Sequence, residues 1–264
     1  MTSPILEFRN VSFSRGSSLV LDEVSFSIEK RDMVALLGAN GIGKTTLLQL
    51  ACRLLLPASG EILLQEKSLE EWSGQELPRC IALVPQQLEI PFDFRVEEIV
   101  AQGRVPYIPL FRSSTLTDRD AVESAMRAVD IMSLRHRYYS ELSGGERQRV
   151  KIAIGLAQQP KIMLLDEPTQ HLDVGRQIEL IALLRDLNRQ GITIIAAVHD
   201  LNLVAENFSS VILLTPEPSW ITGSVAEVLR PDLLERAFSV ERAALAHYCV
   251  EQSRPEVAQL LISK

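Results

Sequence analysis

Residues 38–45 read Gly38-Ala39-Asn40-Gly41-Ile42-Gly43-Lys44-Thr45, which fits the pattern GxxxxGK[ST]. A short apolar run precedes this stretch and a helical pattern follows it, as in the strand–loop–helix context of a phosphate-binding loop. The backbone N–H groups of such a loop point at phosphate oxygens, and the positive end of the next helix adds to the attraction. The pattern predicts that Lys44 contacts the β- and γ-phosphates of a nucleotide and that the Thr45 hydroxyl binds Mg²⁺.

Apolar runs and helical patterns alternate along much of the chain, which predicts an α/β fold with a mainly parallel sheet. The buried strands are expected at 33–37, 81–84, 162–165, 192–198 and 211–214. Helices are expected at 44–56, before Pro57, and at 174–190, with Gly191 as the residue that ends the helix. Before this core, residues 5–13 and 20–28 alternate in polarity and predict two antiparallel strands with a turn at 16–18.

Residues 87–159 have no strong strand signal, and helical spacing is found at 118–131 and 143–157. We therefore predict one domain over 1–264 with an inserted helical subdomain at 87–159. Its catalytic α/β core, with the antiparallel β subdomain, is expected from 1–86 and 160–264.

Two carboxylates, Asp166 and Glu167, directly follow the predicted strand 162–165. Taken alone, such a pair is more simply explained as a solvated strand end. Beside a phosphate-binding loop, Asp166 is suited to the Mg²⁺ site, and Glu167 is placed to polarise an attacking water.

A second anion-binding device is predicted at Leu142-Ser143-Gly144-Gly145-Glu146, just before the helix 147–157. Ser143 followed by Glu146 is also the pattern of a capping box. The two interpretations are compatible, because a capped helix start still presents N–H groups to a phosphate.

Together these stretches resemble the ATPases of the ATP-binding-cassette (ABC) transporters, and the resemblance covers nearly the whole chain. Residues 142–146 are similar to the signature motif of that family. Gln86 matches its Q-loop glutamine, His199 its switch histidine, and Asp173 the aspartate of its D-loop, here 169–173. The implied fold is a P-loop NTPase core with an antiparallel β subdomain and a helical subdomain.

The resemblance also implies a set of site residues. Catalysis would involve Glu167, His199, Lys44 and Gln86, and Mg²⁺ would be bound by Thr45, Gln86 and Asp166. ATP would be bound by Gly38, Ala39, Asn40, Gly41, Gly43, Lys44, Thr45, Thr46, Arg15, Ser143, Gly144, Gly145 and Asp173. Family members usually stack an aromatic residue on adenine where this chain has Arg15, whose planar guanidinium can also lie on a ring. Phe13 is a second candidate, although strand alternation is expected to turn it inward.

The implied assembly is a homodimer in which each ATP lies between the loop 38–45 of one copy and Ser143, Gly144 and Gly145 of the other. The implied partners are polytopic membrane permease subunits and, indirectly, an extracytoplasmic substrate-binding protein. The expected location is the cytoplasmic face of the inner membrane, where the protein would be peripheral and held through its permease.

The stretch 94–107, which contains Gly103-Arg104-Val105-Pro106, resembles importer ATPases for iron-siderophore, haem and cobalamin. Residues 143–150 and 201–203 are similar to the same group. The stretch 215–220 departs from it, because relatives usually have a Lys-Asp-Gly turn there. An ATPase of another transporter and a soluble ABC ATPase in cofactor assembly or regulation remain alternatives. A structural protein without catalysis is disfavoured, because every hydrolytic residue is present.

Bulk properties exclude several other classes. The net charge of −7 disfavours binding to nucleic acid, which needs basic surfaces. The cysteines Cys52, Cys80 and Cys249 have no zinc-site spacing and are expected to be buried apolar residues. The N-terminus lacks the pattern of a secretory signal, and no run approaches the roughly 20 apolar residues of a membrane span.

Overall fold

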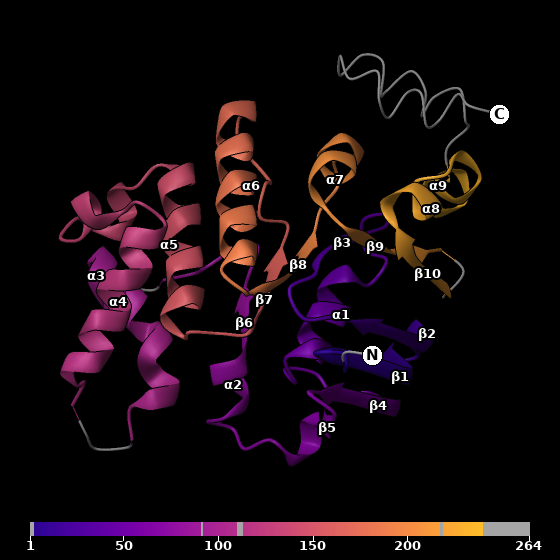
Figure 1. The fold of residues 1–264 in the computed structure, drawn as a ribbon, viewed down its shortest axis with the longest axis horizontal. Helices are drawn as coiled ribbons and strands as arrows, with labels where there is room; N and C mark the ends of the chain where they lie inside the picture. Colours follow the sequence, from indigo (N-terminus) through magenta and orange to yellow (C-terminus); the bar gives the residue numbers. More distant parts are fainter. Residues whose placement is uncertain (1–2, 91, 110–112, 217–218, 240–264) are drawn as a thin grey trace. The chain divides into compact units, whose positions relative to one another are not determined.

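The computed structural model describes residues 3–90, 92–109, 113–216 and 219–239 (Figure 1). The chain divides into two compact units, Met1–Leu69 with Ile195–Lys264 and Glu70–Ile194. Cys249 lies outside the described residues, whereas Cys80 is buried and Cys52 partly buried. Within the described part of the chain, no helix has the length and apolarity that crossing a bilayer requires.

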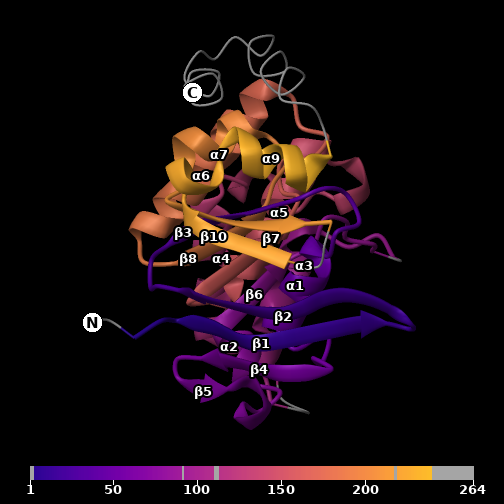
Figure 2. The same cartoon turned by 90° about the vertical axis from the view of Figure 1, so that its right-hand side faces the viewer.

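An antiparallel sheet of order β2-β1-β4-β5 forms one layer of the first unit (Figure 2). β1 (Leu6–Arg15) and β2 (Ser18–Ile28) are the predicted hairpin, and Gly16 takes a positive φ of 62° in its turn. β4 (Ser59–Leu64) and β5 (Lys67–Ser68) were not predicted. The first half of β4 is exposed and only its last three residues are buried, so it lacks an alternating pattern.

The predicted parallel pairing is present in the first unit between β3 (Met33–Leu37) and β9 (Ser210–Thr215). Every residue of β3 is buried, which explains its unbroken apolar sequence. β10 (Ser219–Ser224), which begins at the end of the stretch 215–220, extends the β3–β9 layer by antiparallel pairing with β9. Among the described residues of the unit, the helices are α1 (Lys44–Ala51), α7 (Leu201–Asn207), α8 (Val225–Val228) and α9 (Pro231–Phe238).

The predicted helix 44–56 is wrong at its C-terminal end, because α1 stops at Ala51. Arg53 adopts a left-handed φ of 55°, and the Leu54 N–H turns back to the Gln49 carbonyl at 2.8 Å. The chain therefore leaves the helix well before Pro57. Leu54 and Leu56 are exposed, so no packing holds further turns in place.

The second unit contains one parallel strand pair, β6 (Ile81–Val84) with β7 (Ile162–Asp166). Between them the chain is helical, as predicted, and α3, α4 and α5 pack against one another (Figure 1). Its elements are η1 (Leu69–Glu71, which begins on the last residue of the first unit), α2 (Leu77–Cys80), α3 (Val96–Ala101), η2 (Gln102–Tyr107), α4 (Leu116–Ala128), η3 (Met132–Leu134), η4 (Tyr139–Glu141), α5 (Gly144–Ala157) and α6 (Val174–Arg189). β8 (Thr193–Ala197) runs across the boundary between the units.

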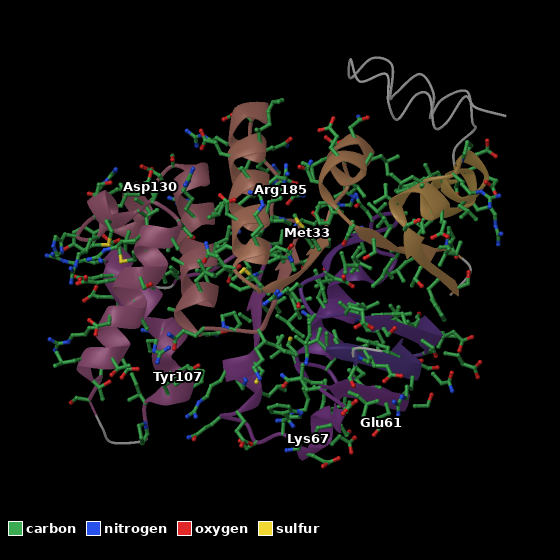
Figure 3. The ribbon with its side chains drawn as sticks, viewed as in Figure 1. Met33, Glu61, Lys67, Tyr107, Asp130 and Arg185 are labelled. Carbon is green, nitrogen blue, oxygen red and sulfur yellow. The ribbon has the colours of Figure 1, made fainter. Side chains whose placement is uncertain are left out.

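A buried ion pair connects the helices of the second unit. Arg104 Nε donates to Asp118 Oδ1 at 3.0 Å, and both side chains are less than a tenth exposed. Arg104 also donates to the Ala157 carbonyl at the end of α5, and its guanidinium lies 3.7 Å from the centre of the Tyr107 ring, labelled in Figure 3. Hydrogen bonds from Thr115, and then the Arg104 charge, lower the pKa of Asp118. This carboxylate therefore stabilises the fold above its unfolded-state pKa, and the contribution is lost as the pH falls through the folded-state value.

We predict that Asp118→Ala lowers the free energy of unfolding by about 3–5 kcal/mol, because it leaves the Arg104 charge buried without its partner. Urea unfolding followed by circular dichroism measures the change. The control is Arg127→Ala, which removes an exposed ion pair with Glu123 and should cost less than about 1 kcal/mol. Equal losses in the two variants would contradict a structural role for the buried pair.

Candidate nucleotide-binding site

The predicted phosphate-binding loop connects β3 to α1 in the first unit. Lys44 is only 5% exposed, and its ammonium lies against the loop itself. Its Nζ donates to the carbonyl oxygens of Gly38 at 2.8 Å and Ala39 at 3.0 Å. Thr46 is buried and Thr45, next to it on the first turn of α1, is exposed. The lysine thus holds the loop in its folded-back shape and places one positive charge at its centre.

Two glycines of the loop are required by its geometry. Gly38 has a φ of 145°, and a Cβ there would lie 2.9 Å from the Leu214 carbonyl oxygen. Gly43 has a φ of 117°, and a Cβ there would lie 3.0 Å from Cγ1 of Val20. L-residues rarely adopt such φ values. Both positions therefore favour glycine for two reasons, the backbone conformation and the lack of room for a Cβ. Gly43 begins α1 without a side-chain cap, which leaves the start of the helix to an anion. The loop therefore fits a polyphosphate.

Arg15 and His199 lie in the same unit as this loop. Arg15 is the exposed last residue of β1, opposite Ser18 in the hairpin whose Val20 packs beside Gly43. Phe13 is half-buried. His199 is exposed directly after β8, and the preceding Val198 N–H donates to the Leu36 carbonyl at 3.2 Å. The hairpin end and the end of β8 thus both lie close to the elements that carry the loop.

In the second unit, the structure brings Gln86 and Glu167 together. The Gln86 side-chain amide donates to Glu167 Oε2 at 2.8 Å and also contacts the side-chain oxygen of Gln170. Glu167 has a left-handed φ of 48°, which is unusual for a residue with a side chain. Such strain tends to be retained at functional sites. The carboxylate is therefore held in a fixed place just beyond β7.

Asp166 is the buried last residue of β7, and its charge interacts with that of Lys151. Burial lowers the pKa of Lys151, while the Asp166 charge opposes that shift. Lys151 Nζ also donates to the carbonyl oxygens of Gln86 at 2.7 Å and Pro85 at 3.2 Å. Carboxylate and hydroxyl oxygens, such as those of Asp166 and Thr45, are donors that suit Mg²⁺.

The stretch 143–146 forms the predicted capping box at the start of α5. The Ser143 N–H donates to Glu146 Oε2 at 2.7 Å, and Ser143 Oγ accepts from the Glu146 N–H at 3.4 Å. A Cβ at Gly144 would meet nothing within 4 Å, so this glycine faces open space. Asp173 caps α6 by accepting from the Arg176 N–H at 3.0 Å. Both motifs are therefore helix starts.

Three residues at this site were missed from the sequence: Lys151, Gln170 and Arg176. Lys151 had a signal, because it is a charged residue between apolar neighbours in the middle of α5. Gln170 lies within the D-loop stretch, and Arg176 follows three residues after its end. Their contacts depend on side-chain directions that residue spacing does not specify.

The structure has a glycine-rich loop before a helix, a carboxylate pair after a buried strand and a second helix start with an open glycine. These features define a P-loop nucleotide hydrolase. The family model described as "ABC transporter" matches residues 21–170. The chain belongs to the ABC transporter family, as an ATP-binding, ATP-hydrolysing member.

The similar proteins extend over most of the chain. The ferric enterobactin transport ATP-binding protein FepC of Escherichia coli K12 is 37% identical over 243 residues, which cover 91% of this chain and 90% of FepC. The hemin import ATP-binding protein HmuV of Pseudomonas fluorescens Pf0-1 is 37% identical over 248 residues, covering 92% and 96%. Among solved structures, a metal-chelate type ABC transporter in an inward-facing conformation matches with a TM-score of 0.81 at 29% identity, covering 90% of each chain. These likenesses confirm the predicted ABC ATPase fold.

We predict that Lys44→Ala weakens ATP binding by about 100-fold or more, because it removes a charged donor from the phosphates. Isothermal titration of the purified protein measures the affinity. The exposed Lys30→Ala is the control for loss of one positive charge in the same unit. An unchanged affinity in Lys44→Ala would contradict the assignment of residues 38–45.

Proposed function

We propose that the chain powers import of a metal chelate, such as an iron-siderophore or haem, or of a cobalamin-like compound, through a separate membrane permease. The similarity to FepC and HmuV over about nine-tenths of the chain carries this proposal. The resemblance of residues 94–107 to importer ATPases of this group supports it. The substrate would not touch this subunit.

In this proposal residues 38–46 hold the phosphates of ATP, with Lys44 on the β- and γ-phosphates. Thr45, Asp166 and Gln86 would hold Mg²⁺, which neutralises charge on the phosphates. Glu167 orients a water and accepts its proton as the oxygen attacks the γ-phosphorus, and the bond to the β–γ bridging oxygen breaks. The hydrogen bond from Gln86 fixes the direction of this carboxylate. His199 contacts the γ-phosphate, and the Arg15 guanidinium stacks on adenine.

The second phosphate-binding device implies a second copy of the chain. Ser143, Gly144 and Gly145 of one copy, with its Asp173, would meet ATP held by the loop of the other. The open space at Gly144 supports this role, since a phosphate needs close access to the backbone. ATP would then hold the homodimer together, and loss of the γ-phosphate would loosen it.

A cavity of about 540 Å³ follows Gln86 in the second unit and suits a permease. Its lining residues are Leu88, Ile90, Phe92, Asp93, Tyr139, Ser140 and Arg147. Phe92 meets Phe94 edge-on, with ring centroids 6.3 Å apart, and is still 73% exposed, which is unusual for so large an apolar side chain. A permease bound there would hold the protein at the cytoplasmic face of the inner membrane and connect it indirectly to a substrate-binding protein.

Nucleic acid is not among the proposed partners. Residues 87–159 are the proposed helical subdomain, beside a catalytic core of 1–86 and 160–264.

We predict that Glu167→Gln slows ATP hydrolysis by about 100-fold or more, the usual contribution of a general base, and leaves ATP binding intact. Phosphate release gives the rate, and light scattering with ATP should show an accumulated dimer. The exposed Glu71→Gln is the matched control. Rapid turnover by Glu167→Gln would exclude Glu167 as the residue that activates water.

We predict that the tagged wild-type protein, extracted gently from native membranes, co-purifies with a polytopic membrane protein and that Phe92→Asp loses it. Aspartate in place of this exposed phenylalanine should prevent docking, because the new charge would have to be desolvated when the permease binds. Leu116→Asp, at another highly exposed apolar position, is the control and should retain the partner. Recovery of soluble partners only would favour a soluble ATPase in cofactor assembly instead.

A further inference from the structure

Arg176, on the first turn of α6, lies beside Gly145 of the signature stretch. A Cβ placed on Gly145 would be 2.7 Å from Arg176 Nη1, 2.9 Å from its Cδ and 3.3 Å from its Cζ. The guanidinium and the end of its aliphatic stem therefore occupy the space beside Gly145. At Gly144, one residue earlier, that space is open. The two glycines of one motif thus have different surroundings.

The glycine at 145 is not explained by its own backbone. Gly145 does not have a positive φ, so any residue could adopt its conformation. A side chain at this position would instead have to displace the flexible end of Arg176. The requirement at 145 is therefore one of packing between two helices.

The other end of this contact is the D-loop aspartate. Arg176 Nε lies 3.3 Å from Asp173 Oδ2, while the Arg176 backbone N–H donates to Asp173 Oδ1 at 3.0 Å. The Asp173 carboxylate thus contacts both the backbone N–H and the guanidinium of Arg176. Arg176 is also one of the positive charges, with Arg137, that favour ionised Glu146 and lower the pKa of that carboxyl, after the larger effect of its hydrogen bonds to Ser143.

A second bridge lies further along the same two helices. Arg149, one turn after Gly145 on α5, donates through Nη2 to Glu179 Oε2 on α6 at 2.8 Å. A cavity of about 320 Å³ remains between the helices, lined in part by Ser143, Glu146, Leu172 and Leu183. Apolar packing does not fill the gap at this level, and the contacts of Arg176 and Arg149 cross it.

We propose that Arg176 is a positioning residue that joins the signature stretch, Ser143–Glu146, to the D-loop stretch, Thr169–Asp173, so that both meet the ATP of the second copy as one rigid surface. This rests on the proposed homodimer. In this arrangement Gly144 admits the phosphate, and Gly145 provides the contact for the arginine. Arg176 does not touch the reacting atoms.

A double-mutant cycle of Arg176→Ala and Gly145→Ala tests the proposal. The measured quantity is the dissociation constant of the ATP-dependent dimer in a Glu167→Gln background, where hydrolysis does not intervene. Gly145→Ala should weaken the dimer when Arg176 is present, because the new Cβ displaces the guanidinium. It should weaken the dimer less in the Arg176→Ala background, where no guanidinium has to be displaced. An equal effect of Gly145→Ala in both backgrounds would overturn the proposal.

Arg176→Ala alone should weaken the dimer and leave the affinity of a single copy for ATP unchanged, because the loop 38–45 is not altered. Arg176→Lys should be intermediate, since an ammonium keeps the charge beside Asp173 but has no plane to lie over Gly145. Arg189→Ala removes the exposed pair with Asp186 at the other end of α6 and should leave the dimer unchanged. Loss of ATP affinity in the single copy would show general damage and contradict a positioning role.

Amide hydrogen exchange without nucleotide separates this proposal from the homodimer on which it rests. The first-turn amides of α5 should exchange about two- to fivefold faster in Arg176→Ala, which corresponds to the loss of one partly exposed ion pair. If the Glu167→Gln protein forms no ATP-dependent dimer, the proposed homodimer is wrong. The exchange data would still test the contact between Arg176 and the start of α5. Unchanged exchange at 143–149 would refute the bridge whether or not the dimer forms.

Discussion

Recognition of a polyphosphate by main-chain N–H groups requires a backbone turn that only glycine adopts, and the site depends on that constraint. Gly38 and Gly43 have φ values of 145° and 117°, and neither has room for a Cβ. Lys44 then holds the turn through the carbonyl oxygens of Gly38 and Ala39. The charge that is proposed to bind phosphate also keeps the loop in shape. β3, which leads into the loop, pairs with β9, and both strands are buried almost throughout.

The second unit is organised around α5, which carries the signature stretch at its start. Arg176 contacts its first turn, Lys151 connects its middle to the backbone of Gln86, and Arg104 binds the carbonyl of Ala157 at its end. Three cations from different elements or positions thus connect this helix to the D-loop, the Q-loop and the buried pair with Asp118. The helix α5 therefore links the backbone of Gln86, through Lys151, to the signature stretch at its start.

The fold was largely predictable because its signals are local. The buried strand at 33–37 and the helices 143–157 and 174–190 were read correctly from apolar spacing and turn residues. β4 was missed because Gly60 and two exposed neighbours hide its strand pattern, and the C-terminal end of α1 was misplaced because Arg53 takes a left-handed conformation that no residue pattern signals. At the site, motif residues could be named from sequence. The bridges made by Lys151 and Arg176 could not, because they depend on tertiary approach between helices.

The central claim is that one chain carries two halves of different ATP sites and that hydrolysis needs both. The most direct test is the ATPase rate per mole of protein as a function of protein concentration, measured at saturating ATP with the molar mass followed by light scattering. If hydrolysis needs both halves, the rate per mole should rise with concentration and level off as the dimer forms. A full rate per mole in solutions where the protein is monomeric would contradict it.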